Sequence, residues 1–561
     1  MSNNTRYYKA AKWLTQLSIG VLLLLPFTGI AQPYGNEWID FDKNYYKFQV
    51  DNEGLHRISY STLQTIGLPL IGQGFQLYYN GQQMPIFVTT NGTFTANDYI
   101  EFYGNENNGL LDTQLYTDPS WHLNNTKSLF AEEATYFLTW HDNDSNSRFE
   151  TVPNDLSTTT TAETHFVHRI DKILNNQFFE GKPIKIEGQN RYFSDFGNGE
   201  GFIGVTINSN NTKSYNFGTT GVYLGEGSSV AQVNLQLVGR SEDAINQPNH
   251  HVEIKVNEVE YHEKIYNGYD NELVNFTVDL TDLNEPQTVI SLTSLADLSE
   301  EDVNAVAFIR LSYPRNFDFD GADFFRFNIA NDGDKYIEIA NFNGGSAPVL
   351  YDLTNNIRLL PTLTGSVYRV LLPQIFSSPS ERTIVLSNTT GLLTVTNITS
   401  LNEVNFIDYT NPNETANYLI ITHPSLTDGT TNQVNRYRNY RTSTNGGGYN
   451  VQIAFIDDLY DQFAYGTEKN PLAIRNFINF AVDNWTNNEL EYVLLLGRAI
   501  EYQNVTYTSS GAAQCLIPSY GDKGSDNMLA ARNANSYLPQ VAIGRIPARN
   551  ADDIRYYLDK L

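Results

Sequence analysis

The sequence is poor in cysteine and in basic residues, and each shortage excludes a class of protein. Cys515 is its one cysteine among 561 residues, so an intrachain disulfide framework and a cysteine-based zinc site are both excluded. Lysine and arginine number 36 against 63 aspartates and glutamates, which gives a formal charge of −27. Because phosphate binding needs a basic surface and no Lys/Arg cluster is visible, we expect no nucleic-acid partner.

Several motifs that would identify a function directly are also missing. The sequence contains no P-loop, no dinucleotide-binding glycine motif and no nucleophile elbow. Charged residues make up only 18% of the chain and aromatic residues 13%, which excludes a disordered polyelectrolyte. The length is sufficient for several domains with cores of their own.

The N-terminus indicates export. Arg6, Lys9 and Lys12 form a basic start, and an apolar run over 19–25 and the small-residue ending 29–31 follow. This layout predicts a signal peptide over residues 1–31, cleaved after Ala31. The apolar run is short for a membrane anchor, and no later segment could span a bilayer, so we expect no transmembrane helix after cleavage.

From about residue 45 to residue 410 the dominant pattern is strand-like alternation. Apolar side chains alternate with polar ones over 46–50, 233–237, 252–256 and 274–280. One apolar and one polar face per strand predict antiparallel sheets packed as sandwiches. Polar linkers at 154–163, 328–334 and 410–417 divide this part into an N-terminal β domain (32–153), a β-sandwich domain (164–328) and a small β domain (335–409).

After residue 417 the pattern changes to alternating strands and helices. Short apolar strands are expected at 418–421, 451–456, 492–496 and 541–544. Asn470-Pro471 is typical of a helix start, and Ile474, Phe477 and Ile478 then share one helix face. Strand–helix alternation predicts a parallel sheet covered by helices, so residues 417–561 form an α/β domain.

Two side chains of the α/β domain are candidates for nucleophilic catalysis. His423 follows the first strand and is expected at the carboxyl edge of the sheet, where such folds place their sites. Cys515 lies among apolar residues without a basic neighbour, which favours a buried structural cysteine over a reactive thiolate. A Cys515–His423 dyad stays open, because dyads are assembled in space.

Four groups of residues are candidates for metal ligands, and the metal stays unknown. The segment His141 to Asn146 has the oxygen alternation of a calcium loop but lacks its glycine and glutamate, so an ordinary turn is favoured. Asp457, Asp458 and Asp461 suit either a cation or the start of a helix. Asp318, Asp320 and Asp323 are similarly open between a calcium site and an ordinary turn. His250 and His251 with His262 could hold a metal, but we expect these histidines at the surface.

Five ordered segments of the α/β part resemble the first half of the gingipain-type cysteine peptidase domain, a clan CD, caspase-like family. These segments are 418–424, 456–461, 473–478, 492–497 and 542–547. Upstream, residues 46–50, 54–58, 136–139 and 313–315 resemble the β-rich leader of such Bacteroidetes proteins. That group includes the sortase-like peptidase of the type IX secretion system.

The resemblance implies a caspase-like fold, protein or peptide substrates, and peptide-bond cleavage by a Cys/His dyad through a thioester. It implies no cofactor for the chemistry, and it leaves a structural calcium ion open. In the family both dyad residues follow the segment that is here Gly544-Arg545, so no catalytic residue is assigned and we expect an inactive, truncated piece of a longer peptidase. Gly497-Arg498 departs from the glycine–aspartate pair of relatives, whereas Ser525-Asp526-Asn527 matches an element to which we assign a structural role.

Three functions remain in competition. We favour an exported gingipain-like thiol protease, present as its leader and the noncatalytic first half of its peptidase domain. The alternatives are a sortase-like transpeptidase of the type IX secretion system, with outer-membrane secretion machinery as its partner, and a noncatalytic adhesion or carbohydrate-binding protein. The expected location is extracellular or at the outer-membrane surface, reached through the periplasm.

Overall fold

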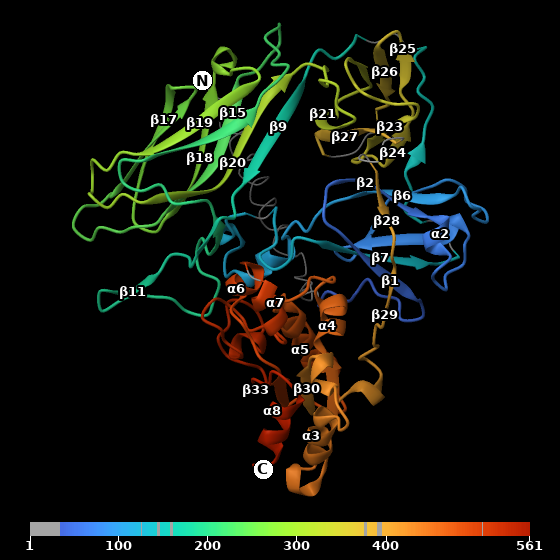
Figure 1. Cartoon of the computed structure of the whole chain (residues 1–561), viewed down its shortest axis with the longest axis vertical. Coiled ribbons are helices and arrows are strands. Elements are labelled where there is room, and N and C mark those ends of the chain that lie inside the picture. Colours follow the sequence, from blue (N-terminus) through green and yellow to red (C-terminus); the bar gives the residue numbers. More distant parts are fainter. Residues whose placement is uncertain are drawn as a thin grey trace, which may run out of the picture.

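The computed structural model places an α/β domain below several β sheets (Figure 1). It describes residues 34–561 except 125, 143–145, 158–160, 375–378, 390–394 and 508. The predicted signal peptide, residues 1–31, lies outside the described residues. Within the described part no helix has the length and apolarity needed to cross a membrane.

The N-terminal β part consists of two sheets that pack around one aromatic core. The strand orders are β29-β1-β7-β3-β4 and β28-β2-β6-β5. Phe48, Phe102 and Tyr136 lie between the sheets, at ring-centroid separations of 5.5–5.7 Å. The elements are β1 (Tyr45–Val50), β2 (Gly54–Ser59), α2 (Tyr60–Leu63), β3 (Phe75–Tyr79), β4 (Gln82–Met84), β5 (Phe87–Val88), β6 (Tyr99–Gly104), β7 (Ala134–Trp140), β28 (Val395–Ile398) and β29 (Asn402–Val404).

The last two strands of this part come from a distant segment of the chain. β28 pairs in parallel with β2, and β29 pairs antiparallel with β1. The small β domain predicted over 335–409 therefore does not keep its last strands. They complete the N-terminal sheets instead, because β1 and β2 would otherwise each present an unpaired edge.

A nine-stranded sheet joins the regions on either side of the linker predicted at 328–334. Its order is β18-β15-β20-β9-β21-β27-β23-β24-β8, and the two halves meet where Asn328 pairs with Val167. The strands are β8 (Glu150–Thr151), β9 (Phe166–Ile173), β15 (Ala231–Gly239), β18 (Asn271–Val278), β20 (Asn304–Arg315), β21 (Phe324–Ala330), β23 (Pro348–Asp352), β24 (Ile357–Leu359) and β27 (Glu381–Asn388).

Two smaller sheets cover this large sheet and make two sandwiches. The sheet β14-β19-β16-β17 shares a core with β15 and β20, and the sheet β22-β26-β25 shares one with β21 and β27. The alternation predicted over 233–237 and 252–256 is confirmed, since the apolar side chains there are buried. The strands are β14 (Thr212–Gly218), β16 (His250–Val256), β17 (Val259–Tyr266), β19 (Gln287–Ser294), β22 (Lys335–Ile339), β25 (Thr362–Thr364) and β26 (Val367–Leu372).

Two hairpin-like pairs and several 3-10 turns complete the β-rich part. β10 (Gln177–Phe179) pairs with β13 (Gly201–Ile203), and β11 (Ile184–Ile186) pairs with β12 (Gln189–Arg191). The β11–β12 hairpin projects from the body of the molecule (Figure 1). The 3-10 turns among the described residues are η1 (Gly72–Gly74), η2 (Leu111–Leu115), η3 (Pro119–Trp121), η4 (Leu280–Asp282), η5 (Pro412–Glu414), η6 (Pro424–Thr427), η7 (Thr444–Gly446) and η8 (Asn527–Leu529).

The α/β domain contains a parallel sheet of order β31-β30-β32-β33, as predicted. The carboxyl ends of all four strands meet at one edge, and helices cover the sheet. The strands are β30 (Tyr418–Thr422), β31 (Val451–Phe455), β32 (Tyr492–Leu496) and β33 (Ala542–Ile546). The helices are α3 (Gln433–Thr442), α4 (Ile456–Phe463), α5 (Leu472–Asn484), α6 (Tyr502–Tyr507), α7 (Ser509–Gln514) and α8 (Ala551–Leu558).

Helix α5 confirms the predicted apolar face. Ile474, Phe477 and Ile478 are fully buried, and the Asn470 side chain accepts the backbone N–H of Leu472 at 3.0 Å. The Phe477 ring packs on those of Tyr409, Phe463 and Trp485, with ring centroids 4.5, 5.0 and 5.9 Å away, respectively. This aromatic cluster anchors the helix to the segment that leads into β30.

Replacing Phe477 by alanine tests this anchor. Because the ring is fully buried, Phe477→Ala should lower the free energy of unfolding by about 3–5 kcal/mol. Chemical denaturation measures the change. Tyr556→Ala on helix α8, where the side chain is 56% exposed, is the matched control and should cost less than about 0.5 kcal/mol. Equal effects of the two substitutions would contradict the packing described.

Candidate active-site region of the α/β domain

Polar candidate residues of the α/β domain lie at the carboxyl edge of the parallel sheet. β30 ends before His423, β31 runs directly into helix α4, and β32 ends before Gly497. Because β31 and β32 flank β30 on opposite sides, this edge is a topological switch point, the place where such folds usually bind their ligands. The sequence therefore placed His423 correctly at this edge.

The His423 side chain is positioned by contacts with its own loop, and among the described residues it does not contact Cys515. Its Nδ1 lies 2.7 Å from Ser425 Oγ and accepts the backbone N–H of Ser425 at 3.2 Å. Its Nε2 lies 3.9 Å from Asp457 Oδ1. Partial burial lowers the pKa of the imidazole, while the charge of Asp457 opposes that shift. These contacts are those of a capping residue at the start of η6.

The environment of Cys515 is the opposite of one that activates a thiol. It is 1% exposed, and its Sγ lies 4.0 Å from the carbonyl oxygen of Ile500. Burial raises the pKa of the thiol, so the thiolate is disfavoured. Among the described residues no contact joins it to His423. The structural role favoured for Cys515 agrees with this environment.

The three aspartates of helix α4 are divided between solvent and a buried ion pair. Asp461 is buried and binds Lys47 Nζ of strand β1 at 2.7 Å. Burial raises the pKa of both Asp458 and Asp461 to about 6. Asp457 is half exposed at the first turn, where carboxylates favour the helix dipole. Of the two readings left open, the structure shows helix-start carboxylates and one ion pair.

The remaining metal candidates are dispersed in the part of the chain that the structure describes. That part holds no group of three or more His, Cys, Asp or Glu side chains arranged to bind a metal. Asp320 pairs with Arg315 at 2.7 Å, and Asp318 accepts from Asn341 at 2.7 Å. Residues 143–145 of the calcium-like segment lie outside the described residues.

The prediction of a surface position is wrong for His250. This side chain is fully buried, with Nδ1 2.8 Å from Asp302 Oδ1 and Nε2 2.7 Å from the carbonyl oxygen of Gly268. His251 follows the opposite face and lies 2.9 Å from Asp297. His250 begins strand β16, whose inward face carries on the alternation of Val252, so the period of the strand buries it.

Arg545 ties the ends of two strands to the loop that carries Cys515. Its guanidinium donates to Asp526 at 2.7 and 2.9 Å, and to the carbonyl oxygens of Gly497, Ile517 and Pro518, each at 2.9 Å. The side chain is only 10% exposed. Asp526 thus has the structural role assigned to it, whereas the role of Arg545 had no local signal beyond the resemblance.

Comparison with known proteins identifies this region. Residues 411–561 match the model of peptidase family C25. Over residues 411–561, which we call the C25 region, this chain is therefore similar to that family. The resemblance to the gingipain-type peptidases is confirmed for this part of the sequence. No curated protein sequence matched the chain.

Solved structures extend the likeness to the β-rich part. The crystal structure of dimeric latent PorU from Porphyromonas gingivalis matches with a TM-score of 0.63 and 12% identity, over 94% of this chain and 50% of that one. The chain thus spans about half the length of that protein. The predicted fold class, β-sandwich modules followed by a caspase-like α/β domain, is confirmed.

Other matches are far weaker. A CBM36 domain of a xylanase from the hindgut metagenome of Trinervitermes trinervoides has a TM-score of 0.16 and 13% identity, over 26% of this chain and 95% of that one. Tandem CBM51 modules of a family 98 glycoside hydrolase from Streptococcus pneumoniae also reach 0.16, with 10% identity, over 48% and 77% of the two chains. Scores this low carry no argument about function.

Buried carboxyl groups join the C25 region to the β-rich part, and sequence reasoning missed them. Asp112 is fully buried and accepts from Asn470 Nδ2 at 2.7 Å. Glu200 is 2% exposed, and its carboxyl group accepts from Tyr502 Oη at 2.8 Å and from the backbone N–H of Gly197 at 2.9 Å. Burial raises the pKa of Asp112 to about 6 and that of Glu200 to about 8. Nothing in the local sequence distinguishes these acids from surface ones.

Glu200 makes stability depend on pH in a defined direction. Unfolded, the carboxyl group loses its proton near its ordinary pKa of 4.5; folded, it keeps the proton until about pH 8. The wild type should therefore lose stability as the pH rises from about 4.5 to 8. Glu200→Gln stays neutral and should be more stable at pH 8 by roughly 3–5 kcal/mol, with the difference vanishing toward pH 4.

Denaturant unfolding from pH 4 to pH 8.5 measures this difference. Glu226→Gln, at an exposed position, is the control and should follow the wild-type profile. Parallel pH profiles for wild type and Glu200→Gln would refute a neutral buried carboxyl group.

Arg545→Lys tests the arginine network. Lysine keeps the charge but cannot reach one carboxylate and three carbonyl oxygens together, so we expect a loss of about 2–4 kcal/mol in unfolding free energy. Arg549→Lys, at an exposed position just after β33, should change stability by less than about 0.5 kcal/mol. Thermal and chemical denaturation compare the two. A neutral Arg545→Lys would show that the network is dispensable.

Proposed function

We propose that this chain is the leader and noncatalytic first half of an exported gingipain-like cysteine peptidase. The observation that carries the proposal is the family C25 match over residues 411–561. The fold likeness over 94% of the chain supports the same assignment for the β-rich part. Substrates of such an enzyme are proteins or peptides, and a structural calcium ion remains compatible with the many surface carboxylates.

The dyad belongs, in this proposal, to residues outside 1–561. A cysteine peptidase needs a thiol whose pKa is lowered by a histidine or another cation. Cys515 has a raised pKa, is buried, and has no contact with His423 among the described residues. His423 in turn is engaged with Ser425. Neither side chain is in a state to form or resolve a thioester.

The second candidate is a sortase-like transpeptidase of the type IX secretion system. The observation that favours it is the extent of the likeness, which includes the β-rich leader and not only the C25 region. Such a protein would act at the outer-membrane surface with secretion machinery as its partner. The two candidates share the thioester step and differ in the acceptor, which is water for the peptidase and an amine for the transpeptidase.

An activity assay tests the proposal. The 561-residue chain should show no turnover of denatured casein or of peptides that end in arginine or lysine. The product of the full reading frame should cleave such substrates and should lose this activity on thiol alkylation. Adding an amine acceptor distinguishes hydrolysis from transpeptidation by the mass of the product.

The control for this assay is Cys515→Ala in both proteins. It should leave the activity of the longer product unchanged, because Cys515 lies in packed surroundings and not at a nucleophile position. Turnover by the 561-residue chain that disappears in Cys515→Ala would overturn the assignment and establish a dyad within this chain.

A further inference from the structure

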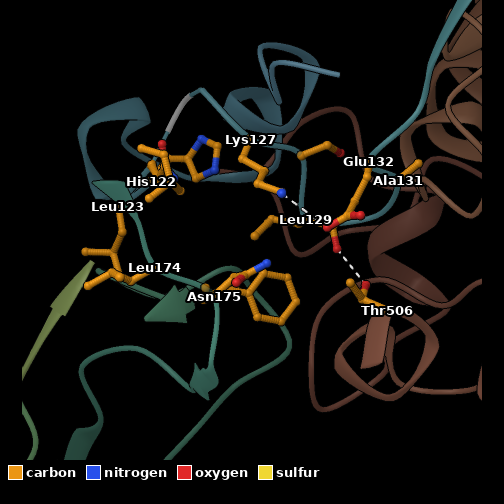
Figure 2. Close-up of a pocket in the computed structure, with 14 residues that line it drawn as sticks. His122, Leu123, Lys127, Leu129, Ala131, Glu132, Leu174, Asn175 and Thr506 are labelled. Atoms are coloured by element: carbon orange, nitrogen blue, oxygen red, sulfur yellow. Dashed lines mark hydrogen bonds and ion pairs between the residues drawn. The ribbon is translucent and has the colours of Figure 1, made fainter. Parts of the chain in front are cut away.

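The cavity where the β-rich part meets helix α6 holds no unpaired charge among the described residues that line it. It encloses about 40 Å³, and its two charged side chains, Lys127 and Glu132, pair with each other at 3.1 Å (Figure 2). The His122 imidazole lines the same cavity, but both of its ring nitrogens are buried. A hollow on the nine-stranded sheet differs from this cavity, because its charged side chains are open to solvent.

This hollow lies between strands β9 and β21, near the position at which Val167 pairs with Asn328. It encloses about 210 Å³. Three neighbouring strands each contribute an arginine to its lining, namely Arg169 of β9, Arg310 of β20 and Arg326 of β21. In the whole chain 63 acidic residues outnumber 36 basic ones, so three cations around one hollow are a local reversal of charge. The reversal favours a negatively charged ligand there.

The strand register places the three arginines on one face of the sheet. Side chains two residues apart on a strand point to the same face, so Arg169 and Asp171 share it. Arg310 is the partner of Asp171 in β20 and lies on that face as well. Arg326 lies two residues before Asn328, whose partner in β9 lies two residues before Arg169. The arrangement is therefore built into the pairing of the strands and does not depend on a loop.

Each of the three arginines donates to one carboxylate, which orients its guanidinium group. The ion pairs are Arg169 Nη2 with Glu381 at 2.9 Å, Arg310 Nε with Asp171 at 2.6 Å, and Arg326 Nη1 with Glu53 at 2.7 Å. Of these carboxylates only Asp171 is among the residues that line the hollow. Burial lowers the pKa of His168, which also lines it, to about 4, so this imidazole is uncharged at neutral pH.

The arginines keep donors for a further partner. A guanidinium group has five N–H groups on three nitrogens. Nη1 of Arg169, Nη1 of Arg310 and Nη2 of Arg326 have no partner among the described residues. The three side chains are 38%, 39% and 47% exposed, respectively, so a ligand from solvent can reach them.

The geometry of the donors suits a tetrahedral oxyanion. Guanidinium groups bind phosphate and sulfate oxygens in a bidentate manner. A phosphate or sulfate group presents four oxygens in different directions, whereas a carboxylate presents two in one plane and is matched by a single arginine. A water needs about 10–15 Å³ of such volume, so a group of five non-hydrogen atoms fits here together with part of a larger molecule.

We propose that this hollow binds a phosphate or sulfate group, either as the free ion or as the end group of a larger molecule. The free N–H groups of Arg169, Arg310 and Arg326 donate to its oxygens, while their carboxylate partners hold the guanidinium groups in place. The site belongs to the β-rich part and not to the carboxyl edge of the parallel sheet. The inference does not depend on the chain being a peptidase.

Titration with matched anions tests the proposal. Isothermal titration calorimetry of the full 561-residue chain is run near neutral pH with phosphate, sulfate, phenyl phosphate or acetate, each replacing chloride at constant ionic strength. We expect saturable binding of phosphate and sulfate, at least about 10-fold tighter than that of acetate, because acetate cannot engage three arginines together. Phenyl phosphate distinguishes the two sources: it binds as well as phosphate if the site accepts an end group, and more weakly if it accepts the free ion.

Variants of single arginines assign the binding to named side chains. Arg169→Gln and Arg326→Gln should each weaken phosphate binding about 10-fold, because a charged hydrogen bond is lost. Arg169→Lys keeps the charge without the planar fork and should restore the affinity only in part. Arg436→Gln is the matched control, since Arg436 is 45% exposed and pairs with Asp559 at 3.0 Å on the α/β domain. It should leave the affinity unchanged.

Thermal unfolding verifies that the variants are folded, as expected for exposed ion pairs that contribute little to stability. If one of the two glutamine variants does not fold, the other still decides the proposal. The absence of saturable phosphate and sulfate binding would overturn it. Acetate binding as tight as that of phosphate would do the same, as would a phosphate affinity that stays unchanged in folded Arg169→Gln and Arg326→Gln.

Discussion

The α/β domain depends on a hydrophobic core that it shares with the β-rich part. Leu115, Tyr116 and Phe130 belong to the same buried cluster as strands β30 and β32 and helix α5. Arg475 on that helix is 1% exposed and donates to the carbonyl oxygen of Gln114 at 2.8 Å. Because a buried guanidinium must be paired, this contact fixes the orientation of the helix relative to the segment 111–130. The domain is therefore packed as one body with the segment 111–130.

The shared core also explains the acid chemistry of the junction. Asp112 and Glu200 lose their water where the two parts meet, and neither has a cation as a hydrogen-bond partner. Neutral partners such as Asn470 and Tyr502 accommodate a protonated carboxyl group without an uncompensated charge. Asp461 has Lys47 as its partner, and burial still raises its pKa. Desolvation thus outweighs the hydrogen bonds that lower the pKa at Asp112 and Glu200, and at Asp461 it also outweighs the charge of Lys47.

Much of the fold could be predicted from the sequence because its signals are local. The alternation of Val252, Ile254 and Val256 sets the period of a strand, and the continuous apolar run of β32 is typical of a strand buried on both faces. Strand partners are not local. The pairing of β28 with β2 joins segments more than 300 residues apart, and the pairing of β21 with β27 merges two predicted domains into one sheet. The sequence pattern shows which face of a strand is buried, but it does not show which strand pairs with it.

In the candidate site, too, some features could be predicted from the sequence and others depend on the tertiary structure. Sequence alone placed His423 at a strand end and favoured a buried, unreactive Cys515, because strand ends and apolar neighbours are visible in a short window. Only the tertiary structure decided that Arg545 would hold the ends of two strands, that His250 would be buried beside Asp302, and that the His122 imidazole would be buried without a partner among the described residues. The physical reason is that burial and pairing depend on segments brought together by folding, and a side chain's pKa and hydrogen bonds follow from those neighbours.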